Sequence, residues 1–89
     1  MEQEILATAQ ALWGVKDNQG IALKLAEEAG EVCGAAVKIP EGRATQKDMD
    51  DEAGDCLIVL AQYAALRGTT IEILLTQRWT HILQRNQKS

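Results

Sequence analysis

Apolar residues recur every three to four positions along four stretches of the chain, which is the spacing of one face of an α-helix. The predicted helices cover residues 3–13, 19–38, 45–67 and 70–86. Gly14, Pro40 and Gly68 lie between them, where helices commonly end. Thr45, followed three residues later by Asp48, is a typical helix N-cap. The pattern predicts an all-α fold class with four helices in a single domain, residues 1–89.

The second half of the third predicted helix, Cys56–Leu66, is apolar on nearly all sides. Such a helix must be covered on more than one side, which three short helices of a chain of 89 residues cannot easily do. We therefore expect a four-helix protomer that assembles into an oligomeric helix bundle, although one chain wrapping this helix alone is the alternative. The candidate positions for the buried interior and the interface are Leu57, Val59, Leu60 and Tyr63.

Composition narrows the class of protein. The net charge of -4 and a pI near 4.8 count against a nucleic-acid partner, because such binders usually carry a basic surface. No stretch resembles a signal peptide or a membrane span, so a cytoplasmic protein without a membrane partner is expected. Cys33 and Cys56 stand in apolar stretches without a CxxC motif, which predicts buried, reduced thiols.

Acidic residues are concentrated in the middle of the chain, where nine of the thirteen lie between Glu27 and Asp55. Several are like-charge neighbours one helical turn apart, an arrangement that destabilises a helix unless something neutralises it. A hard divalent cation such as Mg²⁺ is the simplest candidate, because it takes carboxylate oxygens and substrate phosphates as ligands. The alternative is a solvated acidic face that binds nothing. A di-iron centre is less well supported, since the single histidine, His81, lies in another helix.

Two segments resemble a known signature. Residues 24–31 read KLAEEAGE and residues 51–57 read DEAGDCL, which together are similar to the EExxE…ExxD motif of MazG-type nucleotide pyrophosphohydrolases in the all-α NTP pyrophosphatase superfamily. The resemblance implies an Mg²⁺-dependent enzyme, with Mn²⁺ as a substitute ion, that cleaves a (d)NTP to a (d)NMP and pyrophosphate. It also implies a homodimer or a homotetramer.

The resemblance also assigns roles to individual acids. The implied metal ligands are Glu28, Glu31, Glu52 and Asp55. The candidate catalytic residues are Glu28, as a ligand, and Glu27, which would bind a second metal ion or orient the attacking water. No histidine follows the second motif, which argues against the phosphoribosyl-ATP pyrophosphatases, and the dimeric dUTPases are longer than this chain. A nucleotide-binding or regulatory module without turnover and a helical interaction domain remain as alternatives.

Basic residues near these acids are candidate substrate ligands, because a triphosphate carries more charge than one Mg²⁺ offsets. By helical counting, Lys24 and Lys38 share a face with Glu28 and Glu31, and the last helix carries a basic stripe. The stripe consists of Arg78, His81, Arg85 and Lys88, of which Arg78 and Arg85 are the candidates. Cations near a helix C-terminus also simply oppose the helix dipole. Trp13 and Trp79 continue apolar stripes and are expected in the core or an interface, with a pocket-mouth position for Trp13 as the alternative.

Overall fold

Four α-helices and no strand make up the computed structural model, which describes residues 1–87. The helices are α1 (Glu2–Trp13), α2 (Asn18–Lys38), α3 (Gln46–Leu66) and α4 (Ile71–Asn86). Their bounds lie within one residue of the predicted ones, so the all-α prediction is confirmed. Lys88 of the expected basic stripe lies outside the described residues.

Side chains at the helix starts explain where the helices begin. The Asp17 carboxylate accepts a hydrogen bond from the Gly20 N–H at 2.8 Å, which caps α2. Thr45 and Asp48 form a reciprocal capping box at α3, as the sequence predicts. The hydrogen bond from Thr45 N–H also lowers the pKa of the Asp48 carboxyl. After α3 the chain turns at Gly68, whose φ of 69° suits glycine and ends the helix.

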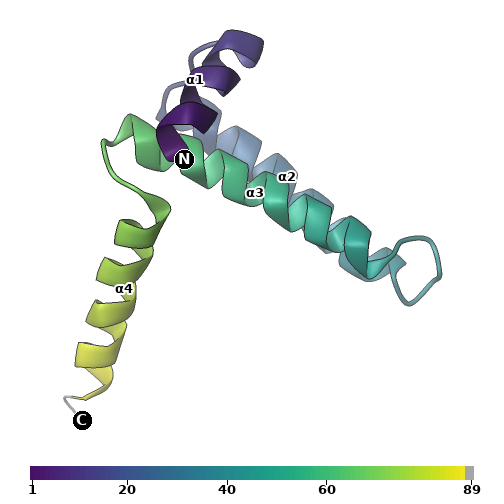
Figure 1. Ribbon diagram of the computed structural model, residues 1–89. Helices are drawn as coiled ribbons and strands as arrows, with labels where there is room; N and C mark the ends of the chain where they lie inside the picture. Colours follow the sequence, from purple (N-terminus) through teal and green to yellow (C-terminus); the bar gives the residue numbers. More distant parts are fainter. Residues whose placement is uncertain (88–89) are drawn as a thin grey trace.

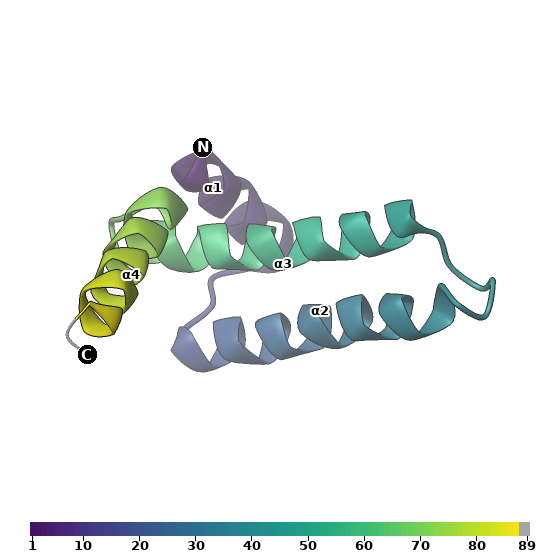
Figure 2. The same cartoon turned by 90° about the horizontal axis from the view of Figure 1, so that it is seen from below.

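α3 is the central helix of the fold. It runs antiparallel to α2, side by side along nearly its whole length, and α1 crosses it near its C-terminal end (Figures 1 and 2). The buried apolar residues are Ala9, Ile21, Ala35, Val59, Ala61, Ala64 and Ala65. Most of them are alanines, whose small side chains let the helix backbones approach closely. The close antiparallel packing of α2 and α3 places the two acidic segments opposite one another.

The last helix projects away from the other three (Figure 1). α4 packs against the end of α3, and none of its residues from Ile71 to Asn86 is buried. Its N-terminus is held by α1, because the Glu2 carboxylate accepts a hydrogen bond from Ile71 N–H at 2.9 Å. Gln3 supports the same corner by donating to the Ala65 carbonyl at 3.1 Å. α4 is therefore fixed at its base and uncovered along its length.

The protomer is more extended than a compact chain of its size. The radius of gyration is 15.7 Å, against about 12 Å for a compact chain of this length. The accessible surface is 6568 Å², against about 5,100 Å² for a monomer of this mass. The projecting α4 enlarges the radius, and it leaves apolar side chains uncovered on the larger surface (Figure 1). No single described helix is long and apolar enough to cross a membrane; only α3 and α4 taken together, with 91° between them, meet the criteria of length and composition.

Several positions predicted for the buried interior or the interface are not buried within the protomer, and their place in an interface stays a prediction. Leu57 and Leu60 on α3 are exposed, whereas Val59 is buried and Tyr63 is half-buried. Trp13 and Trp79 are also exposed, so neither lies in the core of the protomer. Their helical periodicity marks one face of a helix correctly, but the protomer has nothing to cover that face.

The cysteines differ from the expectation as well. Cys33 is exposed and Cys56 is only half-buried, and both are free thiols. The prediction that both are buried is therefore wrong, because the outer side of α2 at Cys33 is not covered by another helix. At Cys56, partial burial and the nearby carboxylate of Glu28 raise the pKa of the thiol, which keeps it protonated and a poor nucleophile.

Candidate metal centre

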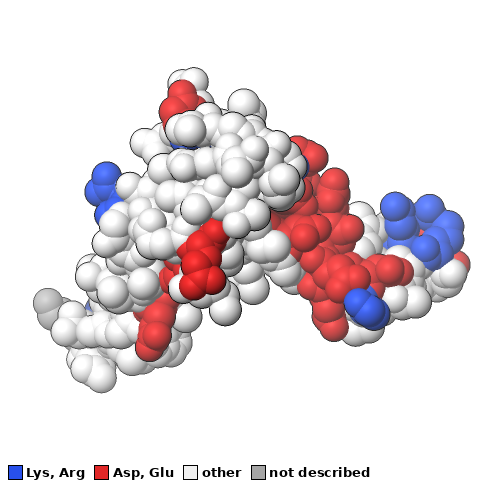
Figure 3. Space-filling model, turned by 45° about the horizontal axis from the view of Figure 1, so that its top comes forward, with Lys and Arg blue, Asp and Glu red and all other residues white. Residues whose placement is uncertain are grey.

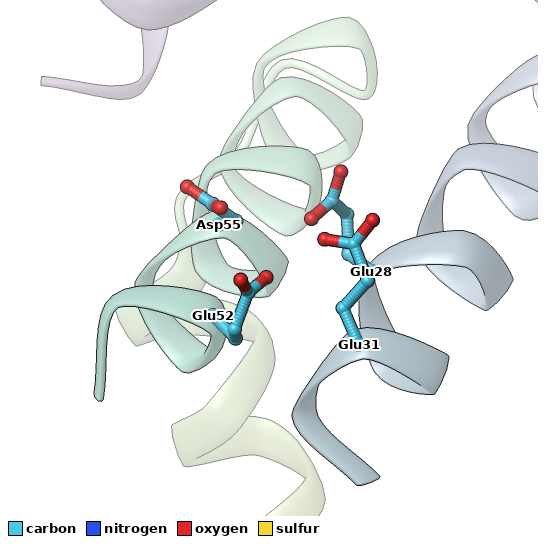
Figure 4. A group of neighbouring side chains, drawn as sticks. All are labelled: Glu28, Glu31, Glu52 and Asp55. Atoms are coloured by element: carbon cyan, nitrogen blue, oxygen red, sulfur yellow. The ribbon is translucent and has the colours of Figure 1, made fainter. Parts of the chain in front are cut away.

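Four carboxylates converge between α2 and α3. Glu28 and Glu31 come from α2, and Glu52 and Asp55 come from α3, each pair being one helical turn apart (Figure 4). One carboxylate oxygen of each residue lies within 4.8 Å of those of the other three. The register of the antiparallel pair thus converts two sequence motifs into one acidic cluster, which we call the carboxylate cluster.

The carboxylate cluster contains oxygens without a partner. Glu28 is buried, with 7% of its surface exposed, and Glu52 is half-buried. Oε2 of Glu28 and Oε2 of Glu52 are inaccessible and have no hydrogen-bond partner among the described residues. A buried charged oxygen is costly unless it is paired or coordinates a metal ion. The donor set of four carboxylates is the type that Mg²⁺ and Mn²⁺ prefer, so these residues fit a hard divalent cation.

Hydrogen bonding and repulsion between carboxylates raise the pKa of one member of the carboxylate cluster, Glu31. The hydrogen bond with Glu52, together with the negative charge of that residue, raises the pKa of the Glu31 carboxyl. Acidic side chains also dominate the surface over this part of α2 and α3 (Figure 3). A cation placed among the four carboxylates would relieve this repulsion.

Among residues 1–87, Lys24 is the basic residue in contact with the carboxylate cluster. Its Nζ lies 3.2 Å from Oε1 of Glu28 and 3.5 Å from Oε1 of Glu27. The hydrogen bond to Glu28 raises the pKa of Lys24, which stays protonated. Lys24 therefore satisfies one oxygen of Glu28 and leaves the other, Oε2, to face the remaining carboxylates.

A cavity adjoins the carboxylate cluster on each side. The first, of about 430 Å³, reaches from Glu28 and Asp55 toward α1. It is lined by Trp13, Lys16, Lys24, Glu28, Asp55, Ile58, Val59 and Gln62. The second, of about 690 Å³, reaches from Glu31 and Glu52 toward the loop between α2 and α3, and includes Lys38 and Arg43. We call them the α1-side cavity and the loop-side cavity.

Of the other predicted site residues, those on α2 lie beside the carboxylate cluster and those on α4 do not. Lys24 lines the α1-side cavity and Lys38 lines the loop-side cavity, so both lie beside the carboxylate cluster. Glu27 lines the loop-side cavity but is not one of the four converging carboxylates. Arg78 and Arg85 lie on α4, which projects away from α2, so the protomer does not bring them to the carboxylate cluster (Figure 1).

Three cavity residues were not found by sequence reasoning: Lys16, Arg43 and Gln62. Arg43 donates to the carboxylate of Glu41 in the loop and also faces the loop-side cavity. The available signal for Gln62 was its position as the one strongly polar residue within the apolar stretch 56–66. Lys16 and Arg43 stand in short loops, where sequence periodicity gives no direction for a side chain.

Comparison of the sequence with known protein families is consistent with a site at these four carboxylates. No curated protein and no solved structure is a significant match to the chain. The sequence pattern of the MazG nucleotide pyrophosphohydrolase domain matches residues 16–88, a range that contains α2, α3 and α4 and all four converging carboxylates. The match covers most of the chain, which therefore belongs to the MazG nucleotide pyrophosphohydrolase domain family.

Proposed function

We propose that the protein is a metal-dependent nucleoside triphosphate pyrophosphohydrolase, which hydrolyses a (d)NTP to a (d)NMP and pyrophosphate. The observation that carries this proposal is the pair of buried, unpartnered oxygens of Glu28 and Glu52 within the carboxylate cluster. A purely solvated acidic face would expose such oxygens to water. Membership of the MazG family supports the same reaction class.

Glu28, Glu31, Glu52 and Asp55 would hold Mg²⁺, with Mn²⁺ as a substitute. When bound, the ion neutralises phosphate charge and lowers the pKa of the attacking water. The chain itself supplies no nucleophile in our proposal, since the Cys56 thiol stays protonated. Glu27, beside the carboxylate cluster, would orient the attacking water or bind a second ion.

The two cavities suggest how the substrate lies. Lys38 and Arg43 line the loop-side cavity and would bind the departing pyrophosphate. The α1-side cavity is bounded by the apolar side chains of Ile58 and Val59 and by Trp13, which suits a nucleoside. Lys24, next to Glu28, would contact the phosphate that lies between the two cavities.

We also propose that two copies of the chain associate. α4 exposes a row of apolar side chains that has no cover in the protomer: Leu75 at 67%, Trp79 at 57% and Leu83 at 42%. Leu57 and Leu60 on α3 are also exposed. Monomers rarely leave a row of large apolar side chains in water. A homodimer, or a homotetramer built from two dimers, would bury it.

A pyrophosphate-release assay with a mixture of dNTPs, with and without MgCl₂, tests the proposed reaction. We expect release of pyrophosphate and dNMP only when the metal ion is present. Orthophosphate as the first product would contradict cleavage of the α–β bond. Nucleotide binding without release would instead identify a nucleotide-binding module, and neither binding nor release would favour a helical interaction domain.

A further inference from the structure

Gln62 is a buried polar residue in the apolar stretch of α3. Only 8% of its surface is exposed, and its neighbours along α3 at positions 58, 59, 61, 64 and 65 are Ile, Val or Ala. The side chain lines the α1-side cavity, which Trp13 also lines. No atom of this amide is among the inaccessible, unpartnered side-chain atoms of the described residues, so the amide stays open to whatever fills the cavity.

The contact that Gln62 makes within its own helix fixes the orientation of the amide. Nε2 of Gln62 donates to the carbonyl oxygen of Ile58, at a distance of 3.4 Å. Since a carbonyl oxygen can only accept, the NH₂ group must point toward Ile58. Oε1 accepts no hydrogen bond from any side chain or backbone group in the part of the chain that the structure describes. One N–H of the amide is used within the helix, whereas both lone pairs of Oε1 are unused, so the acceptor is the larger part of the hydrogen-bonding capacity that Gln62 offers to whatever fills the cavity.

The position of this acceptor relative to the carboxylate cluster is defined by α3. Asp55, Val59 and Gln62 follow one another at helical spacing and line the same cavity. Seven residues of helix separate Asp55 from Gln62, which is a rise of about 10 Å. A nucleotide whose α-phosphate lies at the carboxylate cluster extends its base over a distance of this order.

We propose that Gln62 determines base specificity by accepting a hydrogen bond from an exocyclic amino group at the base edge far from the sugar. This inference rests on the proposed function, because it uses the carboxylate cluster as the phosphate end of the site. It names the substrate class as nucleotides of adenine and cytosine, which carry that amino group. Hypoxanthine and uracil carry an oxo group at the same position, and would place two acceptors against each other.

Matched substrate pairs test the inference. ATP and ITP differ at this position, as do CTP and UTP, so the ratio of kcat/KM within each pair isolates the contact. We expect the wild type to prefer the amino member of each pair by about tenfold or more. Gln62→Leu should bring both ratios close to one, whereas Gln62→Glu keeps an acceptor and should keep the preference. Gln46→Leu, at the far end of α3, is the matched control and should behave as wild type.

A binding measurement makes the test independent of turnover. In a Trp79→Phe background Trp13 is the sole tryptophan, so intrinsic fluorescence reports on the α1-side cavity. AMP and CMP should bind more tightly than IMP and UMP without metal, and Gln62→Leu should remove the difference. Equal binding within both pairs, binding of none of the four, or a preference that persists in Gln62→Leu would overturn the inference. Preferential binding without pyrophosphate release would instead reject the proposed hydrolysis and retain the role of Gln62.

Discussion

Nζ of Lys24 lies 3.2 Å from Oε1 of Glu28, while Oε2 of the same carboxylate is buried and unpartnered. One carboxylate thus contacts a lysine and also faces three further acidic side chains. Lys24 partly neutralises Glu28, and in doing so it competes electrostatically with a cation bound among the four carboxylates.

Lys24→Met should therefore separate metal affinity from substrate affinity. Loss of the ammonium group leaves more negative charge on the cluster, so Mg²⁺ should bind roughly two- to fivefold more tightly by calorimetry without nucleotide. The KM for the triphosphate should rise, because a phosphate ligand is lost. Lys47→Met is the control, since Lys47 pairs with Asp51 at 3.0 Å in the same i,i+4 geometry but away from the cluster. Weaker Mg²⁺ binding by Lys24→Met would contradict this account.

Removal of any one cluster charge should remove most of the turnover without unfolding the protein. Glu28→Gln, Glu31→Gln, Glu52→Gln and Asp55→Asn should each lower kcat/KM by about a hundredfold or more. The melting temperature without metal should equal or exceed that of the wild type, because each substitution relieves repulsion between carboxylates.

The response to Mg²⁺ provides the second measurement for these variants. Millimolar MgCl₂ should raise the melting temperature of the wild type by linkage, and should leave the four variants unchanged. Asp50→Asn is the control, because Asp50 is an exposed acid of α3 that does not belong to the cluster. A wild-type rate in any of the four variants would remove that residue from the proposed ligand set.

The sequence predicted local structure well because the signals are local. Thr45 and Asp48 specify the start of α3, and Gly68 specifies its end. Acids three residues apart must lie on one side of a helix, so each half of the cluster could be anticipated. That the two halves meet was a hypothesis drawn from the need to neutralise their charge and from the family resemblance, since periodicity does not give the register between two helices.

Tertiary placement could not be predicted in the same way. An apolar stripe identifies the face of a helix that should be covered, but it does not say whether its own chain covers it. Trp13 and Trp79 lie on such stripes, and both are exposed because the described part of their own chain does not cover them. Gln62 shows the opposite case, because one polar residue in an apolar run interrupts the pattern without indicating that it lines a cavity.

The corner between α1 and α4 should make stability depend on pH. The hydrogen bond from Ile71 N–H lowers the pKa of the Glu2 carboxyl below its ordinary value of 4.5. Since the folded pKa is the lower one, ionised Glu2 stabilises the fold fully above that ordinary value, and the contribution is lost as pH falls through the lowered pKa. Glu2→Gln should therefore melt at a lower temperature than wild type at neutral pH, and the difference should shrink below pH 4.5.

Glu4→Gln is the control for this titration, since Glu4 lies on the same helix and forms no hydrogen bond to α4 within residues 1–87. Thermal melts followed by circular dichroism between pH 3 and pH 7 give the comparison. A difference between wild type and Glu2→Gln that is the same at all pH values would show that the charge of Glu2 does not contribute.

The exposed face of α4 should be an interface between copies of the chain. Leu75→Glu and Trp79→Glu each introduce a charge into this apolar row, and should weaken self-association by roughly thirtyfold or more. Gln77→Glu is the control, because Gln77 lies on the opposite side of α4 from Leu75 by helical counting. Light scattering at micromolar concentration measures the outcome. An active wild-type monomer under these conditions would reject the interface.

The basic stripe of α4 should act on the site of a partner subunit. Arg78 and Arg85 lie away from the carboxylate cluster of their own protomer, so any contact with substrate requires a second copy. Arg78→Ala and Arg85→Ala should raise the KM for the triphosphate several-fold while the melting temperature changes little. If both variants keep wild-type kinetics, the stripe is a solvated helix face that opposes the helix dipole.

Mixing two impaired chains at a substrate concentration below KM distinguishes action on a partner from action on the same chain. One chain carries Glu52→Gln with both arginines intact, and the other carries Arg78→Ala and Arg85→Ala with all four carboxylates intact. In a mixed dimer, the intact carboxylate cluster of the second chain would receive the arginines of the first. Activity should therefore rise on mixing above the sum of the separate activities. If the arginines act on their own protomer, neither site in the mixed dimer is complete and mixing restores nothing.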